Sequence, residues 1–338
     1  MLLPQNNVSS PLPTEGRLLF AEFRGKMYFN KMTEKLHGPE REKSFERILN
    51  SAAESIPSEK HPERNEDAII NRLDLGLFAV FDGMGGHEAG EKASSVVRDY
   101  ITGFFERLAQ ENTEDVRKQG WKNLLERALR EAGEELKKLR QGYGRKAPDT
   151  TATVVKFIED NGKRCLVYAH VGDSRLYIKY ADELFLEQIS DDDDILKYEK
   201  PDLPKGQREI FESMLSNAKN QEDLLKETPN GSPLYHYFER RNQISRSMGN
   251  ISEKEGAEDM QSGVLDIQSG DIVLLTSDGI HDNLTFDEIA GTAKIYPSPE
   301  KLVKTLVEKA KERSGMGKEV NIRSKPDDMS AVAVEITG

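Results

Sequence analysis

The sequence contains one cysteine in 338 residues. A single cysteine excludes an intrachain disulfide and any zinc finger built on cysteines, and it is typical of a protein in a reducing compartment. No stretch approaches the roughly 18 apolar residues that a membrane-spanning helix needs. The start of the chain has neither the basic residues nor the long apolar run of a secretory signal. These absences predict a cytoplasmic protein without a membrane partner.

Positive charge is scarce relative to negative charge. Lys and Arg number 48 against 60 Asp and Glu, which leaves a net charge of −12. Nucleic acids and anionic membranes bind basic surfaces, so we expect no nucleic-acid partner. Hydrophobic residues make up 36% of the chain, and a chain of this length can still bury a sizeable core in one large domain or two ordinary ones.

Apolar patterns predict a series of strands interrupted by helices. The predicted strands cover residues 18–23, 75–81, 150–158, 165–171, 176–180, 184–189, 263–267, 272–277 and 330–336. The predicted helices cover residues 41–53, 87–108, 121–139, about 207–218, and 298–313. Runs of strands separated by a pair of helices are typical of antiparallel sheets with helices packed outside, an α+β fold.

Acidic residues stand at the ends of the predicted strands. Asp82, Asp173 and Asp278 each follow a strand directly, whereas Glu66-Asp67 precedes a short strand at 68–70 and Asp327-Asp328 precedes the last strand. A carboxylate at the lip of an apolar strand is partly desolvated, which is costly unless a partner neutralises its charge. If the strands lie side by side, the carboxylates repel one another, and bound cations are the natural solution. The alternative is that the Asp-Gly pairs among them are common turns.

Any bound cation would have nearly all-oxygen ligands, because the histidines are scattered and no HExxH motif is present. The histidines are His37, His61, His87, His170, His236 and His281. Hard oxygen ligands select Mg²⁺ or Mn²⁺, or Ca²⁺, over Zn²⁺ or Cu²⁺. Two such ions bridged by one aspartate would activate a water and neutralise a phosphoryl group. Other mechanisms lack their motifs: there is no GxxxxGK[ST] loop and no GxSxG elbow, and Cys165 lies inside a predicted strand as a core thiol.

Seven motifs occur in order over residues 58–338. They are RNEDA (64–68), FAVFDGMGGHEAGEKAS (78–94), DTTAT (149–153), VGDSR (171–175), ISRSMG (244–249), LTSDGIHD (275–282) and DDMS (327–330). This series closely resembles the motifs of the metal-dependent protein phosphatases, the PPM or protein phosphatase 2C family, in its bacterial form. One match could arise by chance, but seven in the family's order could hardly do so.

The resemblance implies a four-layer α-β-β-α sandwich of two antiparallel sheets flanked by helices, with the metals at one end. It implies a serine/threonine protein phosphatase that acts by direct attack of a water bridging two Mg²⁺ or Mn²⁺ ions, without a phosphoenzyme. Phosphorylated proteins would be its substrates, and a cognate Ser/Thr kinase is a candidate partner.

The resemblance also assigns ligands to the first ion. Asp82 would bridge two ions, and the carbonyl of Gly83 would bind one of them. Asp278 and Asp327 would complete the ligand set of the first ion. Asp82 and Asp278 would therefore be catalytic through the ions that they hold.

The remaining acidic residues would serve further ions. Glu66 and Asp67 would hold the second ion, largely through water. Asp173, with Asp278 or Asp282, would hold a third and weaker ion.

The sequence departs from the family's pattern at the phosphate-binding arginine. That arginine usually lies four residues before the first-motif glutamate, where this chain has Pro62. Arg64, His61 or Lys60 would have to reach the substrate phosphate instead, and we take Arg64 as the catalytic candidate.

Two further departures lie in the later motifs. Met84 stands where some members have a histidine proposed as the general acid, and His87 follows three residues later. His87 is the candidate proton donor, and the alternative is a helix-start histidine without a catalytic role. Asp328 replaces the usual asparagine and adds negative charge beside Asp327.

The domain organisation follows from the motifs. Residues 1–57 match none of them and form an N-terminal extension with a regulatory or packing role, and residues 58–338 form the phosphatase domain. A polar insertion at about 191–242 corresponds to the family's flap, and its few apolar residues predict low local stability. Two alternatives stay open: a catalytically weak or inactive relative that binds phosphoproteins or acts as a regulatory module, and a small-molecule phosphoesterase.

Overall fold

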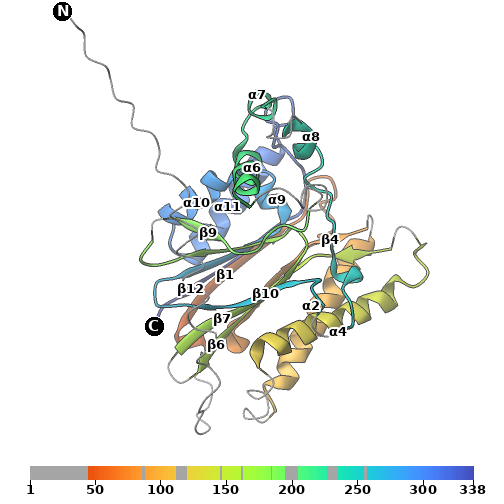
Figure 1. Ribbon diagram of the computed structural model, residues 1–338, viewed down its shortest axis with the longest axis vertical. Helices are drawn as coiled ribbons and strands as arrows, with labels where there is room; N and C mark the ends of the chain where they lie inside the picture. Colours follow the sequence, from red (N-terminus) through yellow and green to blue (C-terminus); the bar gives the residue numbers. More distant parts are fainter. Residues whose placement is uncertain are drawn as a thin grey trace, which may run out of the picture. The chain divides into compact units, whose positions relative to one another are not determined.

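Figure 1 shows the computed structural model as a ribbon. The side chains of strand β3 (Leu77–Phe81) alternate between two apolar layers. Ala79 and Phe81 pack in the same cluster as the helices on one side, whereas Phe78 and Val80 belong to the core between two sheets. This period of two is what a strand buried on both faces requires. The structure describes residues 45–85, 88–111, 120–144, 147–160, 163–183, 185–194, 205–226, 234–254 and 257–338.

Two five-stranded antiparallel sheets form the centre of the described part of the chain. The first has the order β1 (Leu49–Ile56), β12 (Met329–Ile336), β11 (Ile272–Thr276), β8 (Arg175–Lys179) and β9 (Leu186–Gln188). The second has the order β10 (Gln261–Asp266), β7 (Lys163–Val171), β6 (Ala152–Asp160), β3 and β2 (Ala68–Arg72). A short pair, β4 (Gly83–Met84) with β5 (Asp149–Thr150), follows the end of β3.

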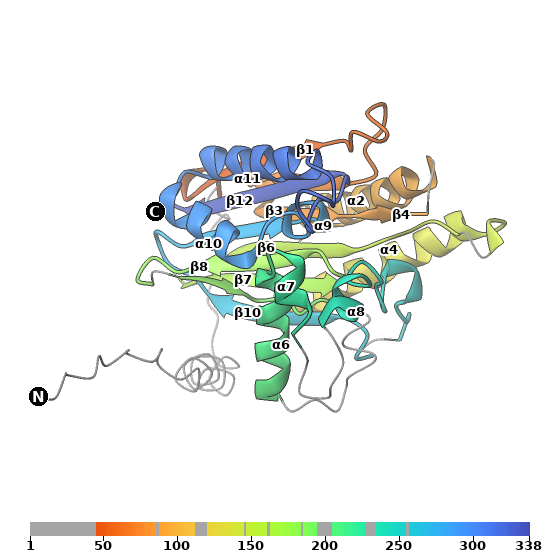
Figure 2. The same ribbon diagram turned by 90° about the horizontal axis from the view of Figure 1, so that it is seen from above.

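Helices cover the outer faces of the two sheets. Helices α2 (Glu88–Leu108) and α4 (Trp121–Arg140) pack on the second sheet through one apolar cluster. Helices α10 (Phe286–Ile295) and α11 (Pro299–Ser314) pack on the first sheet through another, and Figure 2 shows α11 lying along β1 and β12. With the core between the sheets, these layers confirm the predicted α-β-β-α sandwich.

The segment before the first motif differs from its prediction. We predicted a helix over residues 41–53, but the described part holds a short 3₁₀ turn, η1 (Phe45–Arg47), followed by β1. β1 pairs with β12 along its whole length, from Leu49 opposite Ile336 to Ile56 opposite Met329. These residues fall inside the predicted extension, and they pack as an edge strand. The strand predicted at 18–23 lies outside the described residues.

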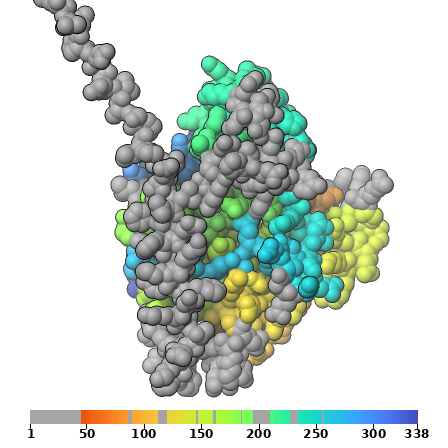
Figure 3. All heavy atoms as spheres, in the orientation of Figure 1, coloured from red at the N-terminus to blue at the C-terminus, as the bar shows by residue number. Residues whose placement is uncertain are grey.

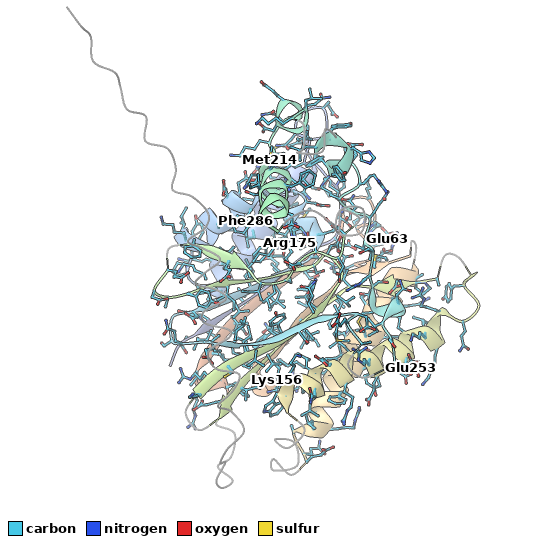
Figure 4. All side chains as sticks on the ribbon, viewed as in Figure 1. Glu63, Lys156, Arg175, Met214, Glu253 and Phe286 are labelled. Atoms are coloured by element: carbon cyan, nitrogen blue, oxygen red, sulfur yellow. The ribbon has the colours of Figure 1, made fainter. Side chains whose placement is uncertain are left out.

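The flap insertion has an apolar cluster of its own. It contains α6 (Lys205–Asn217), α7 (Gln221–Leu224) and α8 (Leu234–Phe238), whose green and teal spheres project from one edge of the sandwich in Figure 3. Their shared cluster comprises Phe211, Ala218, Leu224, Leu234, Tyr237 and Phe238. Helix α6 also contacts α10, and Figure 4 shows Met214 above Phe286. The prediction that this segment has few apolar anchors was therefore wrong.

Candidate active site

The acidic strand ends meet at one end of the sandwich. Asp67 precedes β2 of the second sheet, and its carboxylate accepts a hydrogen bond of 2.7 Å from the hydroxyl of Ser277, which directly follows β11 of the first sheet. That bond joins the two sheets where their acidic residues lie. Asp67 and Asp278 are both buried, at 8% exposure each. The structure therefore brings the first and the sixth of the seven motifs together.

Asp82 lies at the electrostatic centre of this group. Burial raises the pKa of the Asp82 carboxyl well above its usual range, and repulsion from Asp278, Asp67, Asp327 and Asp173 raises it further. Burial and neighbouring carboxylates likewise raise the pKa of Asp67 and of Asp173. Buried carboxylates that repel one another favour a bound cation, so this arrangement is typical of a cation site.

The backbone of Asp82 is fixed by the strand beside it. Its N–H donates to the hydroxyl of Thr151 at 2.9 Å, and its carbonyl accepts from the hydroxyl of Thr150 at 2.9 Å. The threonines of the DTTAT motif thus fix the backbone of Asp82 and leave both oxygens of its carboxylate unused.

Glycine is the one residue type that fits at position 83, directly after Asp82. A Cβ at Gly83 would lie 2.3 Å from the carbonyl oxygens of both Glu66 and Gly90. A side chain at this position would therefore push apart the start of α2, the first motif and β4. The close approach explains why glycine follows Asp82.

Asp328 ties the first motif to the last. One carboxylate oxygen accepts from the N–H of Ser58 at 2.6 Å, and the other accepts from the N–H of Glu66 at 2.7 Å. Burial raises the pKa of the Asp328 carboxyl, although both N–H groups favour its charged form. Sequence reasoning treated Asp328 as extra charge beside Asp327, but it acts as a clamp for the backbone that carries Glu66.

The candidate phosphate-binding groups lie around Glu66. The Nε of Arg64 donates to Glu66 at 3.3 Å, and its Nη1 donates to Glu63, which is labelled in Figure 4. A surface pocket of about 390 Å³ beside it is lined by Glu63, Arg64, Glu91, Lys92 and Ser95. His61 instead faces the backbone: its Nδ1 lies 3.2 Å from the carbonyl oxygen of Arg64. Of the three candidates, Arg64 is the one that contacts a predicted metal ligand.

The structure places Lys60 but does not describe His87. Lys60 is exposed and lines a separate pocket of about 480 Å³ with Glu59, Lys318 and Pro326. His87 and the preceding Gly86 lie outside the described residues, so its role stays a prediction. Met84, at the position of the family's histidine, is half-buried in β4.

Lys325 is a member of the acidic cluster that sequence reasoning missed. Its Nζ contacts Asp278 at 2.5 Å, Asp282 at 2.7 Å and Asp327 at 3.0 Å. The opposite face of Asp282 is paired with Arg241, 3.1 Å away, which comes from the flap side of the chain. The available signal was a lysine two residues before Asp327-Asp328, in a motif that is otherwise acidic.

The donor set fits divalent cations, although it is not arranged as a ready-made cage. Among the described residues, no three Asp, Glu, His or Cys side chains already surround an ion position. However, Oδ1 of Asp278 is buried and has no hydrogen-bond partner in the described part of the chain. A buried, unpartnered carboxylate oxygen beside other carboxylates calls for a cation. Asp82, Asp278, Asp327, Asp67, Glu66 and the Gly83 carbonyl supply the oxygen ligands that Mg²⁺ and Mn²⁺ prefer.

Comparison with known proteins agrees with this arrangement. The sequence profile of protein phosphatase 2C matches residues 59–194. A putative protein phosphatase 2C-type from Streptococcus pyogenes is 23% identical over 261 residues, which cover 75% of this chain and 88% of that protein. In the described ranges, no helix is long and apolar enough to cross a membrane.

Solved structures share the fold. The serine/threonine phosphatase Stp1 from Staphylococcus aureus aligns with a TM-score of 0.61 at 23% identity, covering 90% of this chain and all of that one. The catalytic domain of the serine/threonine protein phosphatase PstP, solved with two manganese ions, aligns with a TM-score of 0.58 at 22% identity, over 86% of this chain and 99% of that one.

Proposed function

Because the chain belongs to the protein phosphatase 2C family, we propose that it is a metal-dependent protein serine/threonine phosphatase. Its substrates are phosphoserine and phosphothreonine side chains of proteins. Such substrates presuppose a serine/threonine kinase that supplies them, and the single cysteine fits a cytoplasmic setting. The sequence relative named a protein phosphatase and the manganese-bound structural neighbour support this proposal.

The acidic cluster holds the metal ions in this proposal. Asp82 with the Gly83 carbonyl, Asp278 and Asp327 hold one ion, and Asp82 with Glu66 and Asp67 holds a second. When bound there, divalent ions would supply Lewis-acid chemistry, which would polarise the phosphoryl oxygens and activate a water nucleophile.

The protein's own residues prepare the site for that chemistry. The DTTAT motif fixes the backbone of Asp82. Asp328 fixes the backbone of Glu66, and the Ser277 hydroxyl orients the carboxylate of Asp67. We assign the substrate phosphate to Arg64, because its guanidinium lies beside Glu66 and borders a surface pocket. We keep His87 as the proposed proton donor to the leaving alkoxide.

One observation carries the proposal: Asp82 is fixed by the motif strand where the carboxylates of Asp67, Asp173, Asp278 and Asp327 converge on it. The test is phosphate release from a phosphothreonine peptide, a phosphotyrosine peptide and a nucleoside monophosphate, with Mn²⁺ and with excess chelator. We expect turnover of the phosphothreonine peptide in Mn²⁺ only, and its loss in Asp82→Asn.

The controls separate the competing functions. Asp99→Asn, on an exposed helix face beside Arg98, should retain full activity. Preferred turnover of the nucleotide would support a small-molecule phosphoesterase. No turnover of any substrate by folded, metal-bound protein would support a phosphoprotein-binding module.

A further inference from the structure

Lys325 is built into the acidic cluster by the backbone around it. Its N–H donates to the side-chain oxygen of Asn283 at 3.0 Å, and its carbonyl accepts from the amide of the same asparagine at 2.8 Å. Asn283 is itself fully buried and donates to the carbonyl of Gly279 at 2.9 Å. The residue is thus fixed to the turn that carries Asp278 and Asp282, and its side chain is only 15% exposed.

The ammonium group of Lys325 is charged in this setting. Its Nζ contacts three carboxylates, Asp278 at 2.5 Å, Asp282 at 2.7 Å and Asp327 at 3.0 Å, and these contacts favour the ammonium form. One fixed positive charge therefore stands among three carboxylates of the cluster, without any bound ion.

Asp282 has both carboxylate oxygens engaged. Oδ2 contacts Nζ of Lys325 at 2.7 Å, and Oδ1 accepts from Nε of Arg241 at 3.1 Å. Arg241 is held in turn by Phe238 of the flap. Its Nη1 donates to the carbonyl of Phe238, and its Cζ lies 3.9 Å from the centroid of the Phe238 ring. Asp282 is therefore satisfied by two cations of the protein itself.

A divalent ion cannot share this position with Lys325. Mg²⁺ or Mn²⁺ would sit roughly 2.0–2.2 Å from the oxygens that it binds. An ion on Oδ2 of Asp278 and of Asp282 would overlap the ammonium group, which contacts the same two atoms at 2.5 and 2.7 Å. The unpartnered Oδ1 of Asp278, in contrast, stays available to an ion on the Asp82 side.

We propose that Lys325 is a resident cation of the cluster, held by Asp278 and Asp282, either of which was expected to join Asp173 in holding a third metal ion. The site then saturates with two divalent ions instead of three.

The inference rests on the metal cluster of the proposed function but not on its substrate, so its test needs no substrate. The full-length chain, Lys325→Met and Lys325→Arg are titrated with Mn²⁺ in a calorimeter, and bound Mn²⁺ per chain is counted by electron paramagnetic resonance. Lys304→Met is the matched control, since Lys304 is 65% exposed and lies on the outer helix α11.

We expect two ions per chain for the parent, for Lys325→Arg and for Lys304→Met, and a third ion for Lys325→Met. Metal-free Lys325→Met should also melt below the parent, because three carboxylates lose their counter-charge. A parent that binds three ions, or a Lys325→Met variant that binds only two, would overturn the proposal.

The number of bound ions can be measured even for a variant that unfolds without metal. Such a variant is purified in Mn²⁺, and its bound metal is measured after gel filtration. This measurement is also independent of catalysis. A chain that binds two ions but releases no phosphate would overturn the phosphatase function and leave the role of Lys325 intact.

Discussion

The Asp328 carboxylate bridges two segments that are far apart in the sequence, the turn at Ser58 and the first motif at Glu66. Each oxygen accepts one backbone N–H. An asparagine, the family's usual residue here, could accept with one oxygen only and would turn an NH₂ group toward the other N–H. The aspartate therefore fits this backbone better than the residue that it replaces.

Asp328→Asn is thus expected to destabilise the protein by about 1–3 kcal/mol, the cost of a buried donor left unsatisfied. Urea unfolding of the metal-free protein measures this, with Asp99→Asn as a surface control that should change stability little. Equal stability of Asp328→Asn and the parent would show that the clamp contributes nothing.

Asp82 supplies the pH prediction. Burial, and then repulsion from Asp278 and its neighbours, raise the pKa of Asp82 in the folded, metal-free protein. In the unfolded chain this pKa is about 3.9, so the folded state takes up the proton first. The contribution of Asp82 to stability therefore falls as the pH rises from the unfolded pKa through the folded one.

We expect metal-free Asp82→Asn to melt a few degrees above the parent near pH 7.5, with the difference closing toward about pH 4.5. Scanning calorimetry in chelator, at matched pH values, measures both curves. A variant that melts below the parent at both ends of this range would contradict the repulsion assigned to Asp82.

The sequence identified the acidic residues, because each stands at the end of an apolar strand and carries a recognisable motif. It could not identify Lys325 or the clamp of Asp328, since both depend on which oxygen faces which nitrogen across the two sheets. Such contacts are set by tertiary packing and leave no periodic pattern along the chain.

At the level of elements, the strands that are apolar on both faces were predicted closely. β3 and β11 are fully buried, so their runs stand out against polar neighbours. The helix predicted at 41–53 was wrong because alanine and glutamate in that segment favour helix locally, whereas pairing with β12 decides its structure. Helix α10 was missed, although Thr285 and Glu288 form a capping box at its start.

The apolar cluster of the flap can be destabilised by a substitution that does not touch the sandwich core. Phe211 of α6 is buried against Tyr237 of α8, with ring centroids 5.0 Å apart. Phe211→Ala removes this contact and is expected to cost about 3–5 kcal/mol of local stability. Hydrogen exchange should become faster in α6 to α8, while the protection of β3 and β11 is retained.

The same variant tests whether the flap selects substrates. Hydrolysis of a small aryl phosphate should stay within a few-fold of the parent, because the acidic cluster is untouched. Turnover of a phosphopeptide should change much more. A folded variant that loses both activities equally would refute a substrate-selecting flap.

For the whole molecule, bound metal and folding are linked. Asp82 is repelled by Asp278, Asp67, Asp327 and Asp173 when no cation neutralises them. Mn²⁺ binds the folded cluster only, so it should stabilise the folded state by mass action and raise the melting temperature. The gain in unfolding free energy is about 2.7 kcal/mol when free Mn²⁺ is a hundredfold above its dissociation constant. Thermal melts over a Mn²⁺ series measure this, and Asp82→Asn should lose most of the shift.

The central claim is that the acidic cluster at the strand ends is the phosphatase site. It is tested most directly by following bound Mn²⁺ and phosphothreonine-peptide turnover in the same samples, as Mn²⁺ is titrated into the metal-free chain. The account predicts that turnover rises with occupancy of the cluster, is abolished by chelator, and is absent from Asp82→Asn at every Mn²⁺ concentration. Full turnover in excess chelator, or a fully occupied cluster that releases no phosphate, would contradict it.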